Sequence, residues 1–227
     1  DAAVIASRTL RTWGESESGL NEQLDGVIAR LDEVGNPTLA FNASGWEGIK
    51  VRLTAKARTV EAANDLLATW DGEIRAVVGD LVFGVDDETM ESVVLDLLRS
   101  RGLSLGLAES VTGGLVAGRL TNVPGASEVF RGGIVSYASD VKFDVLGVPP
   151  GPVVSEEAAA AMAHGARRLL GCDVALALTG VAGPTEQDGM PVGTLCTAVV
   201  LPGPDGEPVT HTRTTRLPGV RDQMRQM

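Results

Sequence analysis

The chain has 227 residues, of which 44% are hydrophobic, so it can bury a substantial core, and its length fits one large or two modest domains. The formal net charge of −11 is unevenly distributed, because residues 1–100 carry 9 basic and 18 acidic side chains, whereas residues 101–227 carry 10 and 12. This asymmetry predicts a domain boundary near residue 100. It also argues against nucleic acid as a partner, since binding to a phosphate backbone depends on clusters of Lys and Arg.

Cysteine usage and the lack of export signals in the sequence indicate a cytoplasmic protein. Cys172 and Cys196 are too few and too unpatterned for a disulfide framework or a zinc site. We find no charged-then-apolar leader, no apolar run of membrane-spanning length and no lipidation signal, so we expect no membrane partner. Because the chain starts at Asp1 and ends at Met227 just as a helix begins, we expect a fragment with a truncated C-terminal helix.

The first hundred residues predict a small two-layer α+β module. Apolar residues recur at helical spacing in two segments, and β-rich segments with turn residues between them surround these. The expected elements, in chain order, are a strand at 8–13, a helix around 20–31, strands at 38–42 and 49–57, and a helix at 60–78. This β-α-β-β-α order is typical of a sheet covered by helices on one face.

A short glycine motif, Gly45-Trp46-Glu47-Gly48, matches the G-x-x-G of KH modules that bind nucleic acids. In those modules the loop joins two helices and contacts backbone phosphates. Here the motif falls in an expected hairpin, carries Glu47 and lies in the acidic half of the chain. We therefore interpret it as a turn, and the module as structural or interdomain.

From residue 86 onward, strands and helices alternate, which favours a three-layer α/β/α domain. Asp86-Asp87-Glu88 complements the dipole of the helix that follows. The remaining expected elements are strands at 103–108, 132–138, 173–178, 193–200 and 207–216, and helices at 113–121, 139–146 and 155–170. The last two strands flank a Pro- and Gly-rich turn and are expected to pair antiparallel. In such domains ligands collect at the carboxyl ends of the parallel strands.

Three loops at expected strand ends carry the candidate chemistry: residues 109–114, 136–142 and 179–184. Ser110 lies between a strand end and a glycine-rich helix start, where it is either a nucleophile or an N-cap. Tyr137 is the only tyrosine of the chain, and Lys142 is one of three lysines. Taken singly, such residues are usual at the surface, and only the company of Ser110 suggests more.

Histidine is scarce, which narrows the choice of a base for Ser110. The chain has only His164 and His211, and neither lies in one of the three loops. A Ser-Lys or Ser-Tyr arrangement is therefore favoured over a Ser-His-Asp triad, provided that burial or a nearby cation lowers the lysine pKa. No ligand set for a metal is evident, and Asp140 with Asp144 on one helix is typical of a solvated face.

Five ordered motifs and a lysine follow the same order and spacing as in the C-terminal domain of the CinA (competence/damage-inducible) family, which the sequence resembles over roughly residues 90–216. They are Ala108-Glu109-Ser110-Val111-Thr112-Gly113-Gly114, Val123-Pro124-Gly125-Ala126-Ser127, Gly132-Gly133-Ile134-Val135-Ser136-Tyr137, Lys142 with Leu146-Gly147-Val148, Val154-Ser155-Glu156-Glu157 and Thr179-Gly180-Val181-Ala182-Gly183-Pro184. Residues 1–85 resemble the middle domain of long CinA proteins, which is KH-like or ferredoxin-like. The resemblance thus divides the chain into domains at 1–85 and 86–227.

The resemblance implies a nicotinamide-nucleotide amidase, which hydrolyses the carboxamide of nicotinamide mononucleotide to nicotinate mononucleotide and ammonia. Ser110 matches the family nucleophile, and Lys142 and Tyr137 match residues that activate it or steer protons. The implied ligand is a pyridine nucleotide, with no cofactor and no metal. Apolar strand and helix faces favour self-association, and we expect a homodimer.

Two groups of residues are expected to bind the substrate. N–H groups near Thr112, Gly113 and Gly114 are expected to hold the oxyanion. The loop with Thr179, Gly180 and Gly183 is expected to take the ribose phosphate without an arginine.

The sequence departs from the family at three places. The family usually has Cys where Val111 stands, often Asn near Ser139, and a more glycine-rich loop in place of residues 185–190. Val111 is expected to pack beneath the turn, whereas Glu186 and Asp188 would repel a substrate phosphate if they faced it. The alternative is therefore a catalytically silent nucleotide-binding or scaffolding part of a larger CinA-like protein. Its chemistry would reside in an N-terminal domain, which resembles molybdopterin-binding folds and is associated with ADP-ribose pyrophosphatase activity in the family.

Overall fold

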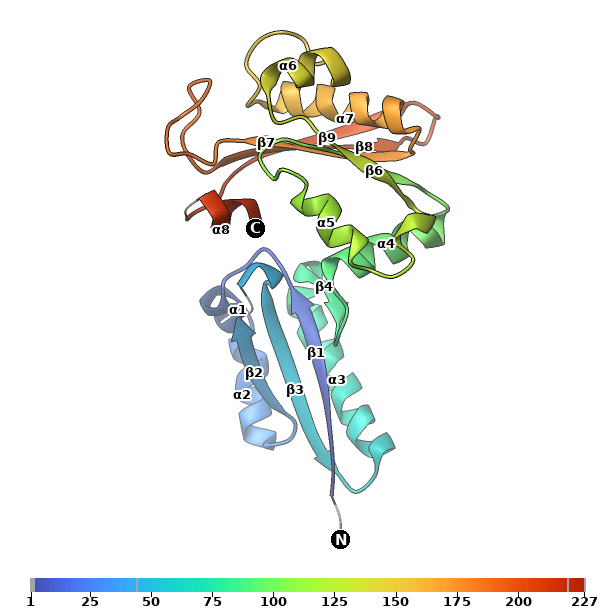
Figure 1. Cartoon of the computed structure of the whole chain (residues 1–227). Coiled ribbons are helices and arrows are strands. Elements are labelled where there is room, and N and C mark those ends of the chain that lie inside the picture. The colour runs from blue at the N-terminus through green and yellow to red at the C-terminus, as the bar shows by residue number, and fades with distance from the viewer. Residues whose placement is uncertain (1–2, 44, 220, 227) are drawn as a thin grey trace. The chain divides into compact units, whose positions relative to one another are not determined.

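The structure is a computed structural model that describes residues 3–43, 45–219 and 221–226 and divides into two compact units (Figure 1). The units comprise residues 1–93 and 94–227. Asp1 and Met227, which entered the sequence predictions, lie outside the described residues. No helix within the described ranges is long and apolar enough to cross a membrane.

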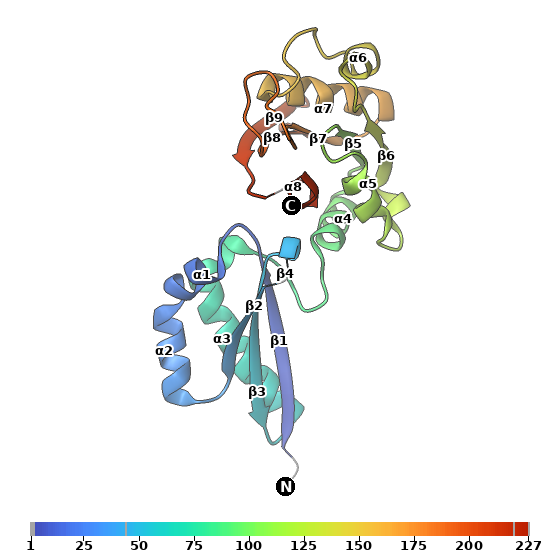
Figure 2. The ribbon, with the colours of Figure 1, turned by 60° about the vertical axis from the view of Figure 1, so that its left-hand side comes forward.

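The first unit is a four-stranded antiparallel sheet with helices on one face (Figures 1 and 2). Its elements are β1 (Val4–Thr12), α1 (Glu17–Gln23), α2 (Asp25–Val34), β2 (Thr38–Ala43), β3 (Ile49–Ala57), α3 (Val60–Val78) and β4 (Val82–Val85). The strand order is β2-β3-β1-β4. The predicted two-layer α+β module is thus confirmed. The prediction missed β4, whose four residues are too few to show a pattern, and took α1 and α2, which meet at Leu24, for one helix.

The core of this unit lies between the sheet and the helices. Alternate residues of β3, namely Val51, Leu53 and Ala55, are buried against α3, which contributes Leu67 and Ile74. The other face of the sheet carries the intervening residues, because successive side chains of a strand point to opposite faces.

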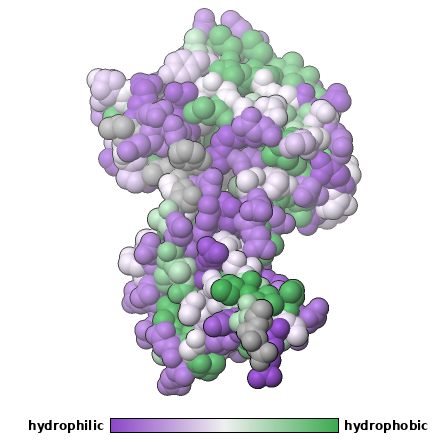
Figure 3. Space-filling view, turned by 60° about the horizontal axis from the view of Figure 1, so that its bottom comes forward, coloured by the Kyte–Doolittle hydropathy of each residue, from purple (hydrophilic) through white to green (hydrophobic). Residues whose placement is uncertain are grey.

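Charge is separated between the two layers of the first unit. The four strands contain no Asp or Glu but include Arg8, Arg11, Lys50, Arg52 and Lys56. The acidic residues of this unit lie in its helices and connections. Most of the molecular face shown in Figure 3 is hydrophilic, with apolar residues in small groups.

The G-x-x-G motif lies in the connection of a β-hairpin, as expected. Gly45–Glu47 forms a single 3-10 turn between β2 and β3, which pair antiparallel from Ala43 opposite Ile49. The Glu47 carboxylate forms ion pairs at 3.0 Å with Arg11 and Lys50. The acidic residue of the motif therefore neutralises neighbouring cations of the sheet.

The second unit is a five-stranded mixed sheet in the order β6-β5-β7-β8-β9. Its elements are α4 (Met90–Arg101, which starts in the first unit), β5 (Leu105–Glu109), α5 (Leu115–Thr121), β6 (Phe130–Val135), α6 (Ser139–Val141), α7 (Glu156–Leu170), β7 (Val174–Gly180), β8 (Thr194–Pro202), β9 (Pro208–Arg216) and α8 (Arg221–Gln226). β5 pairs parallel with both β6 and β7. β8 pairs antiparallel with β7 and with β9, as predicted for the last two strands.

Helices cover both faces of this sheet, which confirms the predicted three-layer α/β/α fold (Figure 1). The Ala-rich α7 packs on one face, where Met162 and Ala166 meet Ala177 and Cys196. On the other face, α4 and α5 pack against β5 and β6. The carboxyl ends of β5, β6 and β7 therefore lie side by side, which brings the three loops of the sequence analysis together.

Candidate active site

The turn after β5 presents Ser110. Its backbone N–H donates to the Leu178 carbonyl of β7 at 2.9 Å, and its own carbonyl accepts from the Gly113 N–H at 3.0 Å. Gly113 and Gly114 then have φ angles of +62° and +94°, in the left-handed region that favours glycine. The sharp turn between strand and helix thus requires both glycines and leaves Ser110 at the strand end.

Glu109, the last residue of β5, fills the N-terminus of α5 with its own carboxylate. The side chain is fully buried and accepts from the backbone N–H groups of Gly114, Val116 and Ala117 at 2.9, 3.2 and 2.8 Å. The expectation that N–H groups near residues 112–114 hold an oxyanion stays a prediction, and the N–H groups of Gly113 and Gly114 have acceptors within the protein. Both of these N–H groups are already bonded within the protein, because local acceptors satisfy the orphan donors of a helix start.

The backbone N–H groups of Val111 and Thr112 remain available at this turn. Neither has an acceptor among the described residues. Their carbonyls accept from Arg225 of α8, from Nε at 3.1 Å to Val111 and from Nη2 at 3.0 Å to Thr112. A trans peptide unit points its C=O and N–H in opposite directions. The bond from Arg225 to the Val111 carbonyl therefore fixes the direction of the Thr112 N–H. The Thr112 hydroxyl is buried without a partner in the described part of the chain.

Lys142 is a buried lysine at the junction of α6 and a π-helical turn, Lys142–Leu146, which together form the helix predicted at 139–146. Its side chain is only 2% exposed, and its Nζ donates to the Tyr137 carbonyl at 3.3 Å. No carboxylate of the described residues forms an ion pair with it. Burial lowers the pKa of Lys142 below its ordinary value, and the field of Asp188 opposes this effect. Burial thus favours the neutral amine, which can accept a proton.

A cavity of about 430 Å³ gathers most of the predicted site residues, a volume within the range of small-molecule sites. The predicted residues that line it are Ser110, Tyr137, Lys142, Thr179, Gly180 and Gly183. The cavity lining does not include Thr112, Gly113 or Gly114 among the described residues. The Thr179 hydroxyl donates to the Val153 carbonyl at 2.7 Å, so its proton is engaged within the protein.

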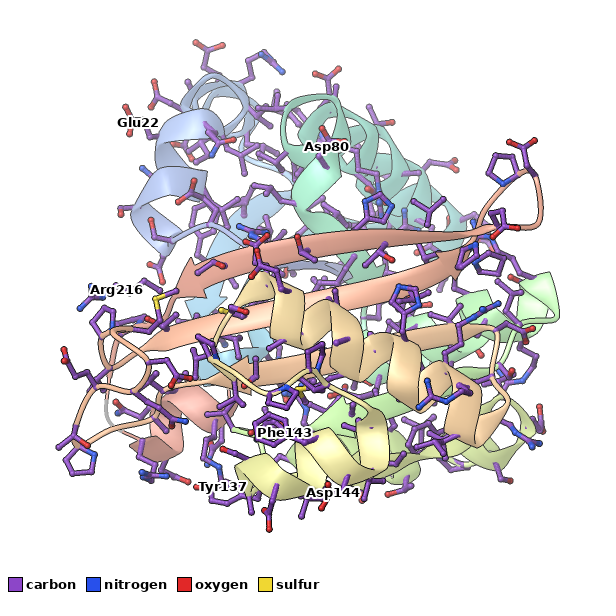
Figure 4. The ribbon with its side chains drawn as sticks, turned by 90° about the horizontal axis from the view of Figure 1, so that it is seen from above. Glu22, Asp80, Tyr137, Phe143, Asp144 and Arg216 are labelled. Atoms are coloured by element: carbon purple, nitrogen blue, oxygen red, sulfur yellow. The ribbon has the colours of Figure 1, made fainter. Side chains whose placement is uncertain are left out.

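Tyr137 lies at the margin of the second unit, beside the helical segment that carries Phe143 and Asp144 (Figure 4). Its phenol is part of a side chain that is 60% exposed. The phenol oxygen accepts from Arg221 Nη1 at 3.1 Å. Tyr137 thus contributes its carbonyl to Lys142 and its hydroxyl to the mouth of the cavity. Asp144 and Asp140 are exposed, as expected for a solvated face.

Arg221 of α8 is a cavity residue that the sequence analysis missed. Besides its bond to Tyr137, its other terminal nitrogen donates to the Gly183 carbonyl. The guanidinium therefore joins two of the strand-end loops across the cavity. The expectation of a phosphate site that lacks an arginine overlooked this residue. No local pattern marks Arg221, because only the fold returns α8 to the loops.

The two acidic residues of the loop at 185–190, Glu186 and Asp188, differ in what surrounds their carboxylates. Asp188 Oδ2 accepts from the backbone N–H groups of Val153 and Val154 at 2.7 and 3.1 Å, so this carboxylate is engaged with the protein. Glu186 does line the cavity. Val111 is buried against Ala182 and Met224, which agrees with the expectation that it packs beneath the turn.

Neither histidine contributes to this site. His164 is exposed, and its Nε2 lies 2.9 Å from the Thr210 hydroxyl of β9. His211 is exposed on β9. Within the described residues, no three His, Cys, Asp or Glu side chains converge as metal ligands would. The side chains that line the cavity thus include the Ser110 hydroxyl, the buried Lys142 amine, an arginine and the Glu186 carboxylate.

Family models match nearly the whole chain. The CinA C-terminal domain matches residues 87–227, and the damage-inducible protein CinA KH domain matches residues 7–84. A CinA-like protein of Frankia casuarinae is 50% identical over 98% of this chain and 51% of its own length. A putative competence-damage inducible protein of Moorella thermoacetica is 45% identical over 80% of this chain and 44% of its own. The chain thus spans about half the length of these relatives.

Solved structures of the same superfamily resemble the chain in part. A CinA superfamily protein from Escherichia coli is 30% identical, with a TM-score of 0.56, over 60% of this chain and 80% of that protein. A competence/damage inducible protein from Agrobacterium tumefaciens is 34% identical, with a TM-score of 0.53, over 60% of this chain and 84% of its own. The sequence resemblance, the family models and these relatives agree: the chain belongs to the CinA family.

Proposed function

We propose that this chain hydrolyses the carboxamide of nicotinamide mononucleotide to nicotinate mononucleotide and ammonia. The observation that carries the proposal is that Ser110 and the buried Lys142 line one cavity, which no histidine of the described residues reaches. A serine needs a base to become nucleophilic, and a lysine kept neutral by burial is such a base. The family relationship supports the choice of an amide and of a pyridine nucleotide.

In the first half of the reaction, Ser110 Oγ attacks the carboxamide carbon and its proton passes to Lys142 Nζ. The carbonyl oxygen becomes an oxyanion, for which the N–H groups of Val111 and Thr112 are the available donors. Lys142 then returns the proton to the leaving nitrogen. The C–N bond breaks, ammonia departs, and the acyl group remains as an ester on Ser110.

In the second half, water replaces ammonia. Lys142 takes a proton from the water, whose oxygen attacks the ester carbon. The same two N–H groups hold the oxyanion, and collapse returns the proton to Ser110 Oγ. Nicotinate mononucleotide leaves, and the enzyme is restored. We further propose that the chain works in the cytoplasm as a homodimer, without a metal or organic cofactor, and that it binds neither nucleic acid nor membrane.

Ammonia release from nicotinamide mononucleotide tests the proposal. We expect the purified chain to release one ammonia for each nicotinate mononucleotide formed, as measured by a coupled ammonia assay and by chromatography of the nucleotide. Nicotinamide released without nicotinate mononucleotide would indicate cleavage of the glycosidic bond and would contradict the proposal.

The second candidate function is a catalytically silent nucleotide-binding or scaffolding part. The presence of Glu186 in the cavity lining favours it, because a carboxylate there opposes a substrate phosphate. Calorimetric binding of nicotinamide mononucleotide without ammonia release would favour this candidate over the amidase.

Arg221 is the cation that we assign to the substrate phosphate, because it lines the cavity and is exposed to a ligand. Replacing Arg221 by alanine is expected to raise the KM for nicotinamide mononucleotide by about 10- to 100-fold, because that is the affinity lost with one hydrogen bond between charged groups. The kcat should change little, since Arg221 forms no hydrogen bond with Ser110 or Lys142. Steady-state kinetics of ammonia release measure both.

The matched control is Arg216→Ala, because Arg216 is also exposed but lies on β9 and is not part of the cavity lining (Figure 4). Nicotinamide riboside, which lacks the phosphate, provides a second comparison. An equal effect of Arg221→Ala on the riboside and on the nucleotide would refute the assignment.

A further inference from the structure

The segment Gln187–Met190 is a tight two-residue hairpin. The N–H and C=O groups of Gln187 and Met190 bond to each other at 3.2 and 2.8 Å. Between them, Asp188 and Gly189 have φ angles of +55° and +73°, as a type I′ turn requires. Asp-Gly is a favoured pair for this turn, because Asp tolerates the left-handed region and Gly adopts it freely.

The side chain of Asp188 joins this hairpin to Val153 and Val154, which form a wall of the cavity. Its Oδ2 accepts the N–H groups of Val153 and Val154, and the Val153 carbonyl in turn accepts the Thr179 hydroxyl at the end of β7. Three separate segments, at Val153–Val154, Thr179 and Asp188, are thus joined by one series of hydrogen bonds. Val153, Val154 and Thr179 all line the cavity.

The loss of these bonds would be costly at this place. Val153 and Val154 are buried, and the exposed Asp188 supplies a charged acceptor to their N–H groups. A buried donor that loses its acceptor keeps the full cost of its desolvation, and bonds to a charged acceptor are the stronger ones. The two segments should therefore separate when the Asp188 carboxylate is removed.

We propose that Asp188 is a positioning residue, which holds the hairpin Gln187–Met190 and the adjoining Glu186 against the Val153–Val154 wall and so sets the shape of the cavity that the ligand meets. The inference rests on the proposed function only for the identity of that ligand. Glu186 and Gln187 line the cavity beside this wall, so their placement depends on the bonds that Asp188 makes.

Asp188 also acts on Lys142 through its charge. Among the charged groups of the described residues, its negative field is the one that raises the pKa of Lys142 against the effect of burial. The other polar partner of the amine is the uncharged carbonyl of Tyr137. Asp188→Asn removes the charge but keeps an acceptor oxygen and a side chain that tolerates a positive φ. The pKa of Lys142 should then fall further.

Two variants test the proposal, with a matched control. Asp188→Gly keeps the turn conformation and removes the carboxylate. Asp205→Gly makes the same change before Gly206, in the exposed turn between β8 and β9. We expect Asp188→Gly to speed amide hydrogen exchange at Val153 and Val154 and to weaken binding of nicotinate mononucleotide by about tenfold in calorimetry. Asp205→Gly should change neither.

Unchanged exchange at Val153 and Val154 in Asp188→Gly would overturn the proposal, and so would faster exchange with unchanged binding. The exchange measurement needs no turnover, so it separates a failure of this inference from a failure of the amidase. In Asp188→Asn, the acid limb of the pH dependence of kcat should move to lower pH. A role confined to folding would leave that limb in place.

Discussion

Ammonia release from nicotinamide mononucleotide is expected to fall by about 10⁴-fold or more when Ser110 is replaced by alanine, a loss typical of nucleophile removal in serine hydrolases. The fold should survive, because Ser110 holds the turn through its backbone N–H and C=O, which alanine retains. Binding of nicotinate mononucleotide should persist as well. Steady-state kinetics and calorimetry measure the two effects separately.

Ser136 provides the matched control for this substitution. It follows β6 as Ser110 follows β5, and its N–H donates to the Glu109 carbonyl at 2.8 Å. Its hydroxyl is buried and has no hydrogen-bond partner in the described part of the chain. Ser136→Ala should keep near-native activity. Comparable losses in the two variants, or full activity of Ser110→Ala, would exclude Ser110 as the nucleophile.

Turnover is expected to fall by about 10²- to 10⁴-fold in Lys142→Met, the contribution of a general base, while nucleotide binding stays nearly intact. In the native chain kcat should rise with pH as Lys142 loses its proton. The midpoint should lie below the ordinary lysine pKa, because burial lowers the pKa of Lys142. A pH-rate profile measures this. Lys56→Met, a change of an exposed lysine on β3, is the control.

The substitution Lys142→Met should raise the stability of the fold, although it lowers turnover. The folded pKa of Lys142 lies below the unfolded value, so the unfolded chain binds more protons between these two values, and native stability rises with pH across that window. Lys142→Met removes the cost of burying the amine. The variant should therefore unfold at a higher temperature than the native chain at neutral pH, with a difference that shrinks as pH rises toward the unfolded pKa. For the kinetic prediction above, a Lys142→Met variant that loses nucleotide binding but keeps residual turnover would instead identify Lys142 as a phosphate ligand.

The convergence of the three loops could be predicted from sequence because it depends on one general property of parallel sheets. Ser110, Tyr137 and Thr179 each lie at or just beyond the carboxyl end of a strand, and β6, β5 and β7 are neighbours in the sheet. Apolar strands separated by helices are sufficient to predict that arrangement. The burial of Lys142 could not be predicted in this way, because Tyr137, only five residues earlier, is exposed.

The donors and the arginine could not be predicted in the same way. Glu109 competes for the N–H groups of α5, and only the geometry of the turn shows that its carboxylate reaches three of them. Arg221 lies in a polar segment without a motif, and a contact across 84 residues with Tyr137 leaves no local signal. The acidic residues at 185–190 posed a similar difficulty, because the bonds of Asp188 distinguish it from Glu186.

The separation of charge in the first unit has a consequence for how this protein meets charged surfaces. Arg8 of its strands is paired with Asp71, and Arg11 and Lys50 are paired with Glu47, which leaves Arg52 and Lys56 as the strand cations without an ion pair among the described residues. The net charge of −11 is therefore what a charged surface meets, and only within the short distance over which salt leaves it unscreened.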